Sequence, residues 1–176
     1  MNKKLEQLNT EDFLMVYQIM EQSFPPCERR TYEKELELLK NPNYHVFVMK
    51  KDNMDIVGFL ATWELETFRF VEHFAIQQAA RGLGIGSEMM KEYLSYENKP
   101  VFIEVEEPDT MMSKRRIDFY KRLGFVYNGF GYLQPCLQDN TTEVSLKIMS
   151  YPAGITQSEF NHFRDEVFSK VYGIAI

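Results

Sequence analysis

Cysteine and long apolar runs are both scarce in this sequence of 176 residues. Its two cysteines, Cys27 and Cys136, agree with a reducing compartment and require no disulfide. No stretch approaches the roughly 18 consecutive apolar residues of a membrane span, and no apolar signal core follows the first residues. We therefore expect a cytoplasmic protein without a membrane partner. A nucleophilic Cys27 is not favoured, because its Pro25-Pro26-Cys27 setting contains no base.

Basic residues are in deficit, with 20 lysines and arginines against 26 aspartates and glutamates and a formal net charge of −6. This deficit disfavours nucleic acid as a partner, because duplex affinity comes mainly from basic contacts to phosphates. It mildly favours a cationic substrate such as an amine, although solubility alone also explains a net charge of this size.

The pattern of apolar residues predicts one α+β domain around a mixed sheet. Helices are predicted over 10–24, with Thr10 as the N-cap, and over 30–39, 84–96 and 113–123, the last closed by Gly124. The predicted strands are 5–8, 44–50, 56–64, 69–76, 101–106, 125–128 and 143–149, and residues 51–55 form a hairpin loop. The helix between strands 69–76 and 101–106 implies a right-handed crossover and a parallel pair.

Residues 151–176 predict one additional amphipathic helix that packs on the domain formed by residues 1–150. Thr156 and Glu159 match a capping box at its start. The apolar residues that follow share one stripe: Phe160, Phe163, Val167, Val171 and Ile174. This helix is also a candidate contact for a homodimer.

The glycine-rich run Arg81-Gly-Leu-Gly-Ile-Gly86 lies between a predicted strand and a predicted helix. Its glycines let the backbone turn tightly and bring N–H groups close to a ligand. The following helix start adds free N–H donors and the positive end of the helix dipole, which together suit a phosphate or pyrophosphate.

Three kinds of ligand site are possible interpretations of this run, in addition to a plain turn with no ligand. An NTPase phosphate loop is excluded, because no lysine follows the glycines. A dinucleotide fingerprint is partly matched by Gly82, Gly84 and the downstream Glu104. However, its third small residue is misplaced, and no second mononucleotide half follows. A coenzyme A cradle tolerates the loop that precedes the glycines.

The segment Arg81-x-x-Gly84-x-Gly86 resembles the acyl-CoA signature Gln/Arg-x-x-Gly-x-Gly/Ala of the GNAT superfamily of N-acetyltransferases. The segment 119–125, Phe-Tyr-Lys-Arg-Leu-Gly-Phe, is similar to the Tyr-x-x-x-Gly-Phe segment of that family. Residues 72–76 resemble the fourth strand of the family, and the resemblance covers roughly residues 3–150. It implies acetyl-CoA as the cosubstrate, no metal, and a sheet that splays between strands 69–76 and 101–106.

The resemblance also implies which residues contact the donor. Backbone groups of residues 74–76 would bind pantetheine and polarise the thioester carbonyl, and the amides of residues 81–87 would hold the pyrophosphate. The expected cofactor-binding residues are Phe74, Ala75, Ile76, Arg81, Gly82, Leu83, Gly84, Ile85, Gly86, Ser87, Ser113 and Tyr120. Two places depart from the family pattern. Ser113 stands where asparagine is common, and Arg116, which we expect to point to solvent, stands where alanine is common.

Acyl transfer to an amine needs a base for the amine and an acid for the departing thiolate. Glu72 is the first candidate for the base, because strand alternation puts it on the face of Phe74 and Ile76. Glu104 is the second candidate and Glu64 the third. Tyr120 is the candidate acid, since the pKa of a phenol lies near that of a thiol. His73 is expected on the opposite face from Glu72, in a structural role.

The acceptor is the least specified part of the site. The connection between the first two helices and the hairpin over 130–135 are expected to line its pocket, with Phe24, Glu28, Trp63 and Tyr132 as candidate contacts. The predicted activity is therefore transfer of an acetyl group from acetyl-CoA to a primary amine of a small molecule or peptide. A non-catalytic acyl-CoA sensor on the same fold and a dinucleotide-binding protein remain the alternatives.

Overall fold

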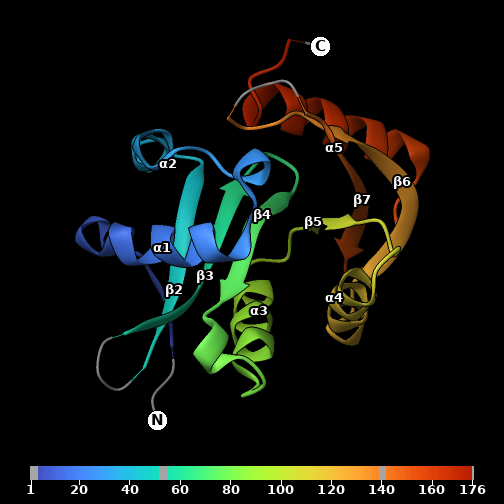
Figure 1. Ribbon diagram of the computed structural model, residues 1–176. Helices are drawn as coiled ribbons and strands as arrows, with labels where there is room; N and C mark the ends of the chain where they lie inside the picture. Colours follow the sequence, from blue (N-terminus) through green and yellow to red (C-terminus); the bar gives the residue numbers. More distant parts are fainter. Residues whose placement is uncertain (1–3, 52–54, 139–141, 176) are drawn as a thin grey trace.

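The computed structural model describes residues 4–51, 55–138 and 142–175, and its centre is a seven-stranded mixed sheet (Figure 1). The strand order is β1-β2-β3-β4-β5-β7-β6. The strands are β1 (Leu5–Gln7), β2 (Tyr44–Lys50), β3 (Ile56–Glu64), β4 (Arg69–Ile76), β5 (Val101–Glu106), β6 (Val126–Gln134) and β7 (Val144–Tyr151). The α+β class and the four strands from β2 to β5 are as predicted, whereas β6 continues six residues beyond the predicted strand over 125–128. Residues 52–54 of the predicted hairpin loop lie outside the described residues.

Five α-helices and three short 3-10 helices accompany the sheet within the described residues. The α-helices are α1 (Phe13–Ser23), α2 (Tyr32–Leu38), α3 (Ile85–Ser95), α4 (Met111–Arg122) and α5 (Gln157–Lys170). The 3-10 helices are η1 (Thr10–Asp12), η2 (Pro26–Glu28) and η3 (Gln78–Ala80). Thr10 is not the cap that the sequence suggested: Asn9 caps η1, and α1 continues from that turn. Thr156 and Glu159 form the predicted capping box of α5.

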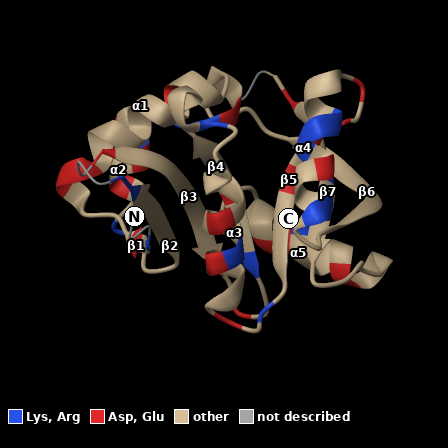
Figure 2. Cartoon of the chain, turned by 90° about the horizontal axis from the view of Figure 1, so that it is seen from below, with Lys and Arg blue, Asp and Glu red and all other residues tan. Residues whose placement is uncertain are grey.

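Helices cover both faces of the sheet. Residues of α1, α2 and α5 pack into one hydrophobic cluster, and residues of α3 and α4 pack into the other. In Figure 1, α3 and α4 accordingly lie together at the lower end of the sheet, while α5 crosses its upper right side. Viewed from below, α3 is near the centre of the molecule and α4 is at the upper right (Figure 2).

The parallel pair of β4 and β5 is the feature that positions the site. Only three register pairs join these strands, from Arg69 opposite Val101 to Val71 opposite Ile103. Beyond Val71 the two strands diverge, and β5 continues its pairing with β7 on its other edge. The second half of β4 therefore has a backbone edge without a partner strand in the described part of the chain. This is the splay expected between strands 69–76 and 101–106.

The C-terminal helix α5 contributes to the core of the sheet. Phe163 is fully buried and stacks on Phe102 with ring centroids 4.5 Å apart, a burial that contributes roughly 2–3 kcal/mol. Phe160, Val167 and Val171 are buried beside it, whereas Ile174 is exposed. Among the described residues no helix is both long and apolar enough to cross a membrane.

A disulfide that the sequence did not require joins the two cysteines. Cys27 and Cys136 are bonded across a separation of 109 residues. The bond joins η2 to the segment after β6, and the Leu137 amide donates to the Cys27 carbonyl beside it at 2.9 Å. Cysteine count alone could not show this, because the partners meet only when β6 is in place.

Candidate active site

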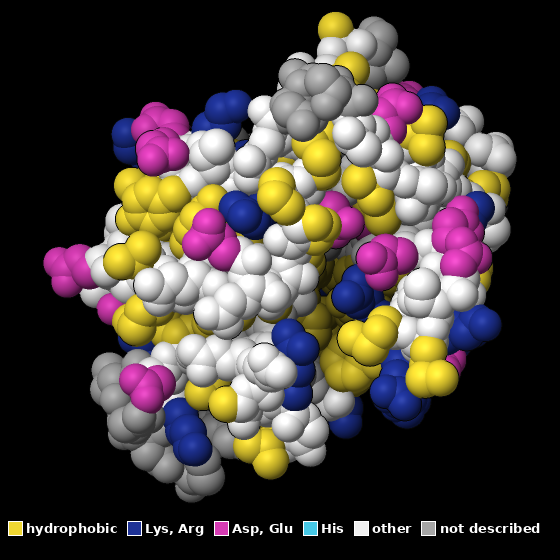
Figure 3. Space-filling view, in the orientation of Figure 1, with side chains coloured by type: hydrophobic (Ala, Val, Ile, Leu, Met, Phe, Trp, Pro, Cys, Tyr) yellow, Lys and Arg dark blue, Asp and Glu magenta, His cyan; other side chains and the backbone are white. Residues whose placement is uncertain are grey.

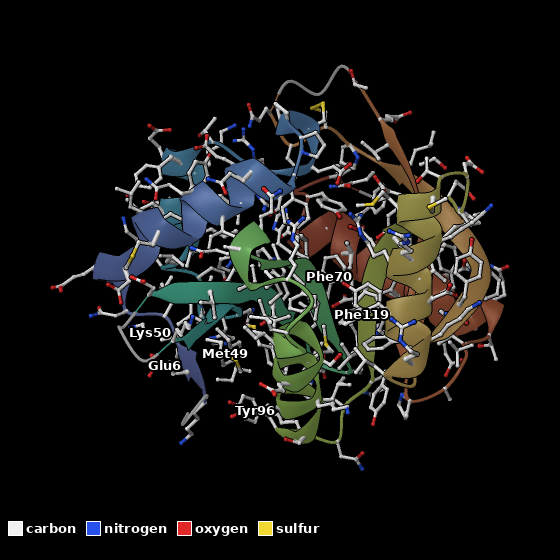
Figure 4. All side chains as sticks on the ribbon, turned by 60° about the horizontal axis from the view of Figure 1, so that its bottom comes forward. Glu6, Met49, Lys50, Phe70, Tyr96 and Phe119 are labelled. Carbon is white, nitrogen blue, oxygen red and sulfur yellow. A yellow bond between two sulfur atoms is a disulfide. The ribbon has the colours of Figure 1, made fainter. Side chains whose placement is uncertain are left out.

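A groove opens where β4 and β5 diverge. Its deeper part is a cavity of about 280 Å³ lined by β4, β5, α4 and the connection between α1 and α2. A second pocket of about 270 Å³ lies over the start of α3 and shares Phe74, Ile76, Arg81 and Phe119 with the first. Figure 3 shows the surface hollowed in this region, with hydrophobic and basic side chains at the rim. The two pockets are therefore continuous, and Phe119 lies between α3 and α4 at their junction (Figure 4).

The glycine run forms the floor of the second pocket. Gly82 and Gly84 both have φ of +78°, a conformation that L side chains rarely adopt. Gly84 is the N-cap of α3 and no side chain caps this helix, so its first amides remain available. Arg81 donates from Nε to the carbonyl of Ile76 at 3.0 Å and braces the loop against the end of β4. This donor set suits a phosphate or pyrophosphate.

The predicted cofactor residues are distributed unevenly over the groove. Phe74, Ile76, Arg81 and the glycines with Ile85 and Ser87 line the second pocket, and Ala75 and Tyr120 line the deeper cavity. Leu83 is 62% exposed. Ser113 is buried in the capping box of α4, where its hydroxyl bonds to Thr110. Ser113 therefore lines neither pocket.

Glu104 has the environment of a base. It lies on β5 just after the last residue paired with β4, and it lines the deeper cavity. Tyr172 donates a hydrogen bond of 2.6 Å to its carboxylate, and Tyr132 donates to the same oxygen. Burial raises the pKa of Glu104 to about 7, and the two tyrosine hydrogen bonds partly oppose that rise. A carboxylate with this pKa exchanges protons near neutral pH.

Glu72 has a different environment from the one predicted. Ala61 pairs with His73 but Thr62 pairs with Val71, so Glu72 is the extra residue of a β-bulge in β4. The bulge turns its side chain away from the face of Phe74 and Ile76. Its carboxylate accepts from Arg30 at 2.8 Å and from Trp63 at 2.7 Å. Burial raises the pKa of Glu72, but the charges of Arg30 and His73 and the hydrogen bonds from Trp63 and Arg30 together outweigh this effect, and the net pKa is lowered.

The bulge also corrects the placement of His73. Both His73 and Glu72 contact the α1–α2 connection, so they do not point to opposite faces. The His73 Nε2 lies 2.6 Å from the carbonyl oxygen of Glu28, and its ring packs edge-on against Phe24. Because a carbonyl only accepts, Nε2 carries the proton. The third candidate base, Glu64, is paired with Lys99 at 2.5 Å near the first residues of β4 and lines neither pocket.

Tyr120 lies on α4 and lines the deeper cavity with Glu104. Burial raises its pKa to about 12, and the nearby charge of Arg116 has a smaller, opposite effect. The phenol therefore keeps its proton at neutral pH. Arg116 does not simply point to solvent, since it pairs with Glu106 at 3.1 Å and forms part of the cavity wall.

Two of the four predicted acceptor contacts line the cavity, namely Phe24 and Glu28. Trp63 is 2% exposed and holds Glu72, while Tyr132 holds Glu104. Sequence reasoning missed Arg30 and Tyr172, which supply the polar partners of Glu72 and Glu104. Nothing in the local pattern marks either residue, because both act on strands far away in the sequence. Within the described residues no cluster of histidine, cysteine, aspartate and glutamate could hold a metal ion.

Comparison with protein families gives a match to part of the chain. The family model of the acetyltransferase (GNAT) domain matches residues 42–127, a span that runs from β2 into β6 and includes the glycine run. No match is found among curated protein sequences.

Solved structures share this fold. A protein of Bacteroides thetaiotaomicron assigned to the acetyltransferases of the GNAT family is 28% identical, with a TM-score of 0.89 over 98% of this chain and 99% of that one. A variant of the spermidine N-acetyltransferase of Vibrio cholerae has a TM-score of 0.64 at 13% identity and covers 90% and 96% of the two chains. The ribosomal-protein-S18-alanine N-acetyltransferase of Escherichia coli has a TM-score of 0.62 at 19% identity, with coverage of 88% and 96%. At these lower identities the last two show likeness of fold alone.

Proposed function

Because residues 42–127 match the family model of the acetyltransferase (GNAT) domain, we propose that the chain transfers an acetyl group from acetyl-CoA to a primary amine of a small molecule or peptide. The observation that carries this proposal is one cavity, lined by Glu104 and Tyr120, that is continuous with an uncapped helix start. Glu104 supplies a proton acceptor, Tyr120 supplies a proton donor, and the start of the helix supplies a phosphate site.

The donor has a complementary surface along the groove. Acetyl-CoA supplies the acyl group as a thioester, together with a pyrophosphate. The amides of residues 82–87 are placed to hold the phosphates, and the unpaired edge of β4 over 74–76 offers backbone donors for a carbonyl oxygen. Helix α4 adds a run of lysine and arginine residues beside the groove, visible in blue in Figure 2, which favours an anionic donor.

Glu104 is the base in this proposal. An alkyl ammonium has to lose a proton before it attacks, and Glu104 accepts that proton directly or through water. Its pKa of about 7 suits this task better than the lowered pKa of Glu72, which Arg30 holds ionised. Glu72 instead fixes Arg30 against β4 and closes the wall of the cavity.

Tyr120 is the acid. Tyr120 lines the same cavity, and a phenol that stays protonated at neutral pH has a proton to give to the departing thiolate. The attack of the amine and the departure of the thiolate then depend on two different side chains, so the two roles can be separated by mutation.

The test combines binding with turnover. Calorimetry with acetyl-CoA, coenzyme A and NAD(P) should detect only the first two, and a panel of amines should then release free thiol and yield an N-acetylated product by mass spectrometry. Binding of acetyl-CoA without thiol release for any amine would favour a non-catalytic sensor. Binding of NAD(P) alone would favour the dinucleotide alternative and contradict the proposal.

A further inference from the structure

Four carboxylates line the deeper cavity, and three of them have protein partners. Glu72 is paired with Arg30, Glu106 is paired with Arg116, and Glu104 accepts from two tyrosines. Glu28 is different. In the described part of the chain, no side chain or backbone group donates a hydrogen bond to its carboxylate or forms an ion pair with it.

The segment that carries Glu28 is held rigidly. The His73 ring donates to the Glu28 carbonyl at 2.6 Å, and Cys27 beside it is bonded to Cys136. On the other side, Arg29 donates to the Tyr17 hydroxyl at 2.9 Å and to the carbonyl of Phe24 at 3.3 Å. The Glu28 carboxylate is therefore presented to the cavity by a fixed backbone and not by a mobile loop.

An unpaired carboxylate in such a place is costly for the protein alone. Burial raises the pKa of Glu28 and the charge of Glu106 raises it further, and the more weakly acting charges of Arg116 and His73 oppose this rise without cancelling it. A cation in the cavity would relieve this cost, because a partly buried carboxylate without a donor gains most from a charged partner. The reacting amine cannot supply that cation, since it has to be neutral when it attacks.

We propose that Glu28 binds a second cationic group of the acceptor, so that the acceptor is a diamine or another amine that carries an additional positive charge. This inference rests on the proposed acetyl transfer in the same cavity. It assigns the two nitrogen groups to different carboxylates: the reacting amine to Glu104 and the retained cation to Glu28. The net charge of −6 attracts such an acceptor at long range.

The test uses the full chain and compares acceptors that differ only in the second charge. Linear α,ω-diamines from ethylenediamine to cadaverine are each paired with the n-alkylamine of the same carbon count. Wild type should prefer the best diamine over its matched monoamine by about tenfold or more in kcat/KM. Glu28→Gln should remove this preference, so that the diamine and its matched monoamine reach similar values of kcat/KM. Glu33→Gln, an exposed change of equal charge on α2, should retain the preference.

Calorimetric binding of the same amines separates this inference from the proposed function. A diamine that binds wild type about tenfold more tightly than it binds Glu28→Gln supports the inference, even if no thiol is released. In that outcome the proposed acetyl transfer fails and the role of Glu28 stands. Thiol release with equal kcat/KM for diamine and monoamine, unaffected by Glu28→Gln, would leave the acetyl transfer in place and overturn the role of Glu28. An equal loss for both acceptors in Glu28→Gln would also overturn it.

Discussion

At the scale of single residues, Glu72 and Glu104 lie just beyond the last paired residues of β4 and β5, yet their environments are opposite. Arg30 and Trp63 stabilise the charge of Glu72, whereas burial destabilises the charge of Glu104. The same amino acid is therefore a structural anion on one strand and, in the proposed mechanism, a proton acceptor on the other.

Replacement of Glu72 by glutamine tests its structural role. Glu72→Gln leaves the buried guanidinium of Arg30 with fewer charged partners, and the free energy of unfolding should fall by about 3 kcal/mol. Chemical denaturation measures this change. Glu37→Gln, on an exposed ion pair, should cost less than about 0.5 kcal/mol. A stable Glu72→Gln protein that has lost its turnover would instead identify Glu72 as the base.

Tyr120 tests the acid step independently of binding. Tyr120→Phe removes only the hydroxyl, so turnover should fall by more than about tenfold while calorimetry finds acetyl-CoA affinity nearly intact. Phe119→Leu, a change in the neighbouring apolar wall, should affect affinity more than turnover. Unchanged turnover in Tyr120→Phe would remove this residue from the mechanism.

The sequence could not predict that Glu104, and not Glu72, has the environment of a base. Strand alternation places residues 72, 74 and 76 on one face. Only the bulge opposite residues 61 and 62 turns the side chain of Glu72 to the other face. A bulge is one extra residue in the register of two strands, and the apolar pattern here carries no mark of it. The glycine run could be predicted, because its signal is local and its residue types are needed for a positive φ.

At the scale of elements, the disulfide ties η2 to the segment after β6 at one wall of the cavity. Its cysteines are 109 residues apart, so the bond removes much freedom from the unfolded chain. It also holds the backbone next to Glu28, while the glycine run and the start of α3 line the second pocket.

Replacement of both cysteines by serine should therefore lower the free energy of unfolding by about 2–4 kcal/mol in denaturant titrations. It should also raise KM for the acceptor while leaving the affinity for acetyl-CoA within about twofold, since the glycine run is not attached to this segment. Wild type treated with a reductant should behave in the same way. Equal weakening of donor and acceptor binding would contradict this division of the groove.

At the scale of the whole molecule, the C-terminal part of the chain completes the site. Tyr172 lies just beyond α5 and donates to Glu104, 68 residues earlier in the sequence. The sequence predicts the capping box and apolar stripe of α5, because both are local patterns. It cannot predict the contact of Tyr172, which depends on where α5 docks on the sheet.

The contact between Tyr172 and Glu104 should influence the pH dependence of kcat/KM. The hydrogen bond from Tyr172 lowers the pKa of Glu104, so Tyr172→Phe should raise it above about 7. A base acts when deprotonated, and the acid limb of kcat/KM should therefore move to higher pH in this variant. The half-buried Tyr127, whose ring faces Lys121, provides the control Tyr127→Phe. A limb that moves to lower pH, or equally in both variants, would contradict the assignment.

The pH dependence of kcat/KM in wild type and in Glu104→Gln, measured by thiol release with one amine acceptor, tests directly whether Glu104 is the base. In wild type the rate should rise with pH and level off above an apparent pKa of about 7, because Glu104 has to lose its proton before it accepts another. In Glu104→Gln, kcat/KM at the plateau should fall by at least about a hundredfold, and the rise with pH should disappear. Glu64→Gln should keep both the plateau value and the rise with pH. A Glu104→Gln enzyme with the wild-type rate and the wild-type acid limb would contradict the assignment of Glu104 as the base.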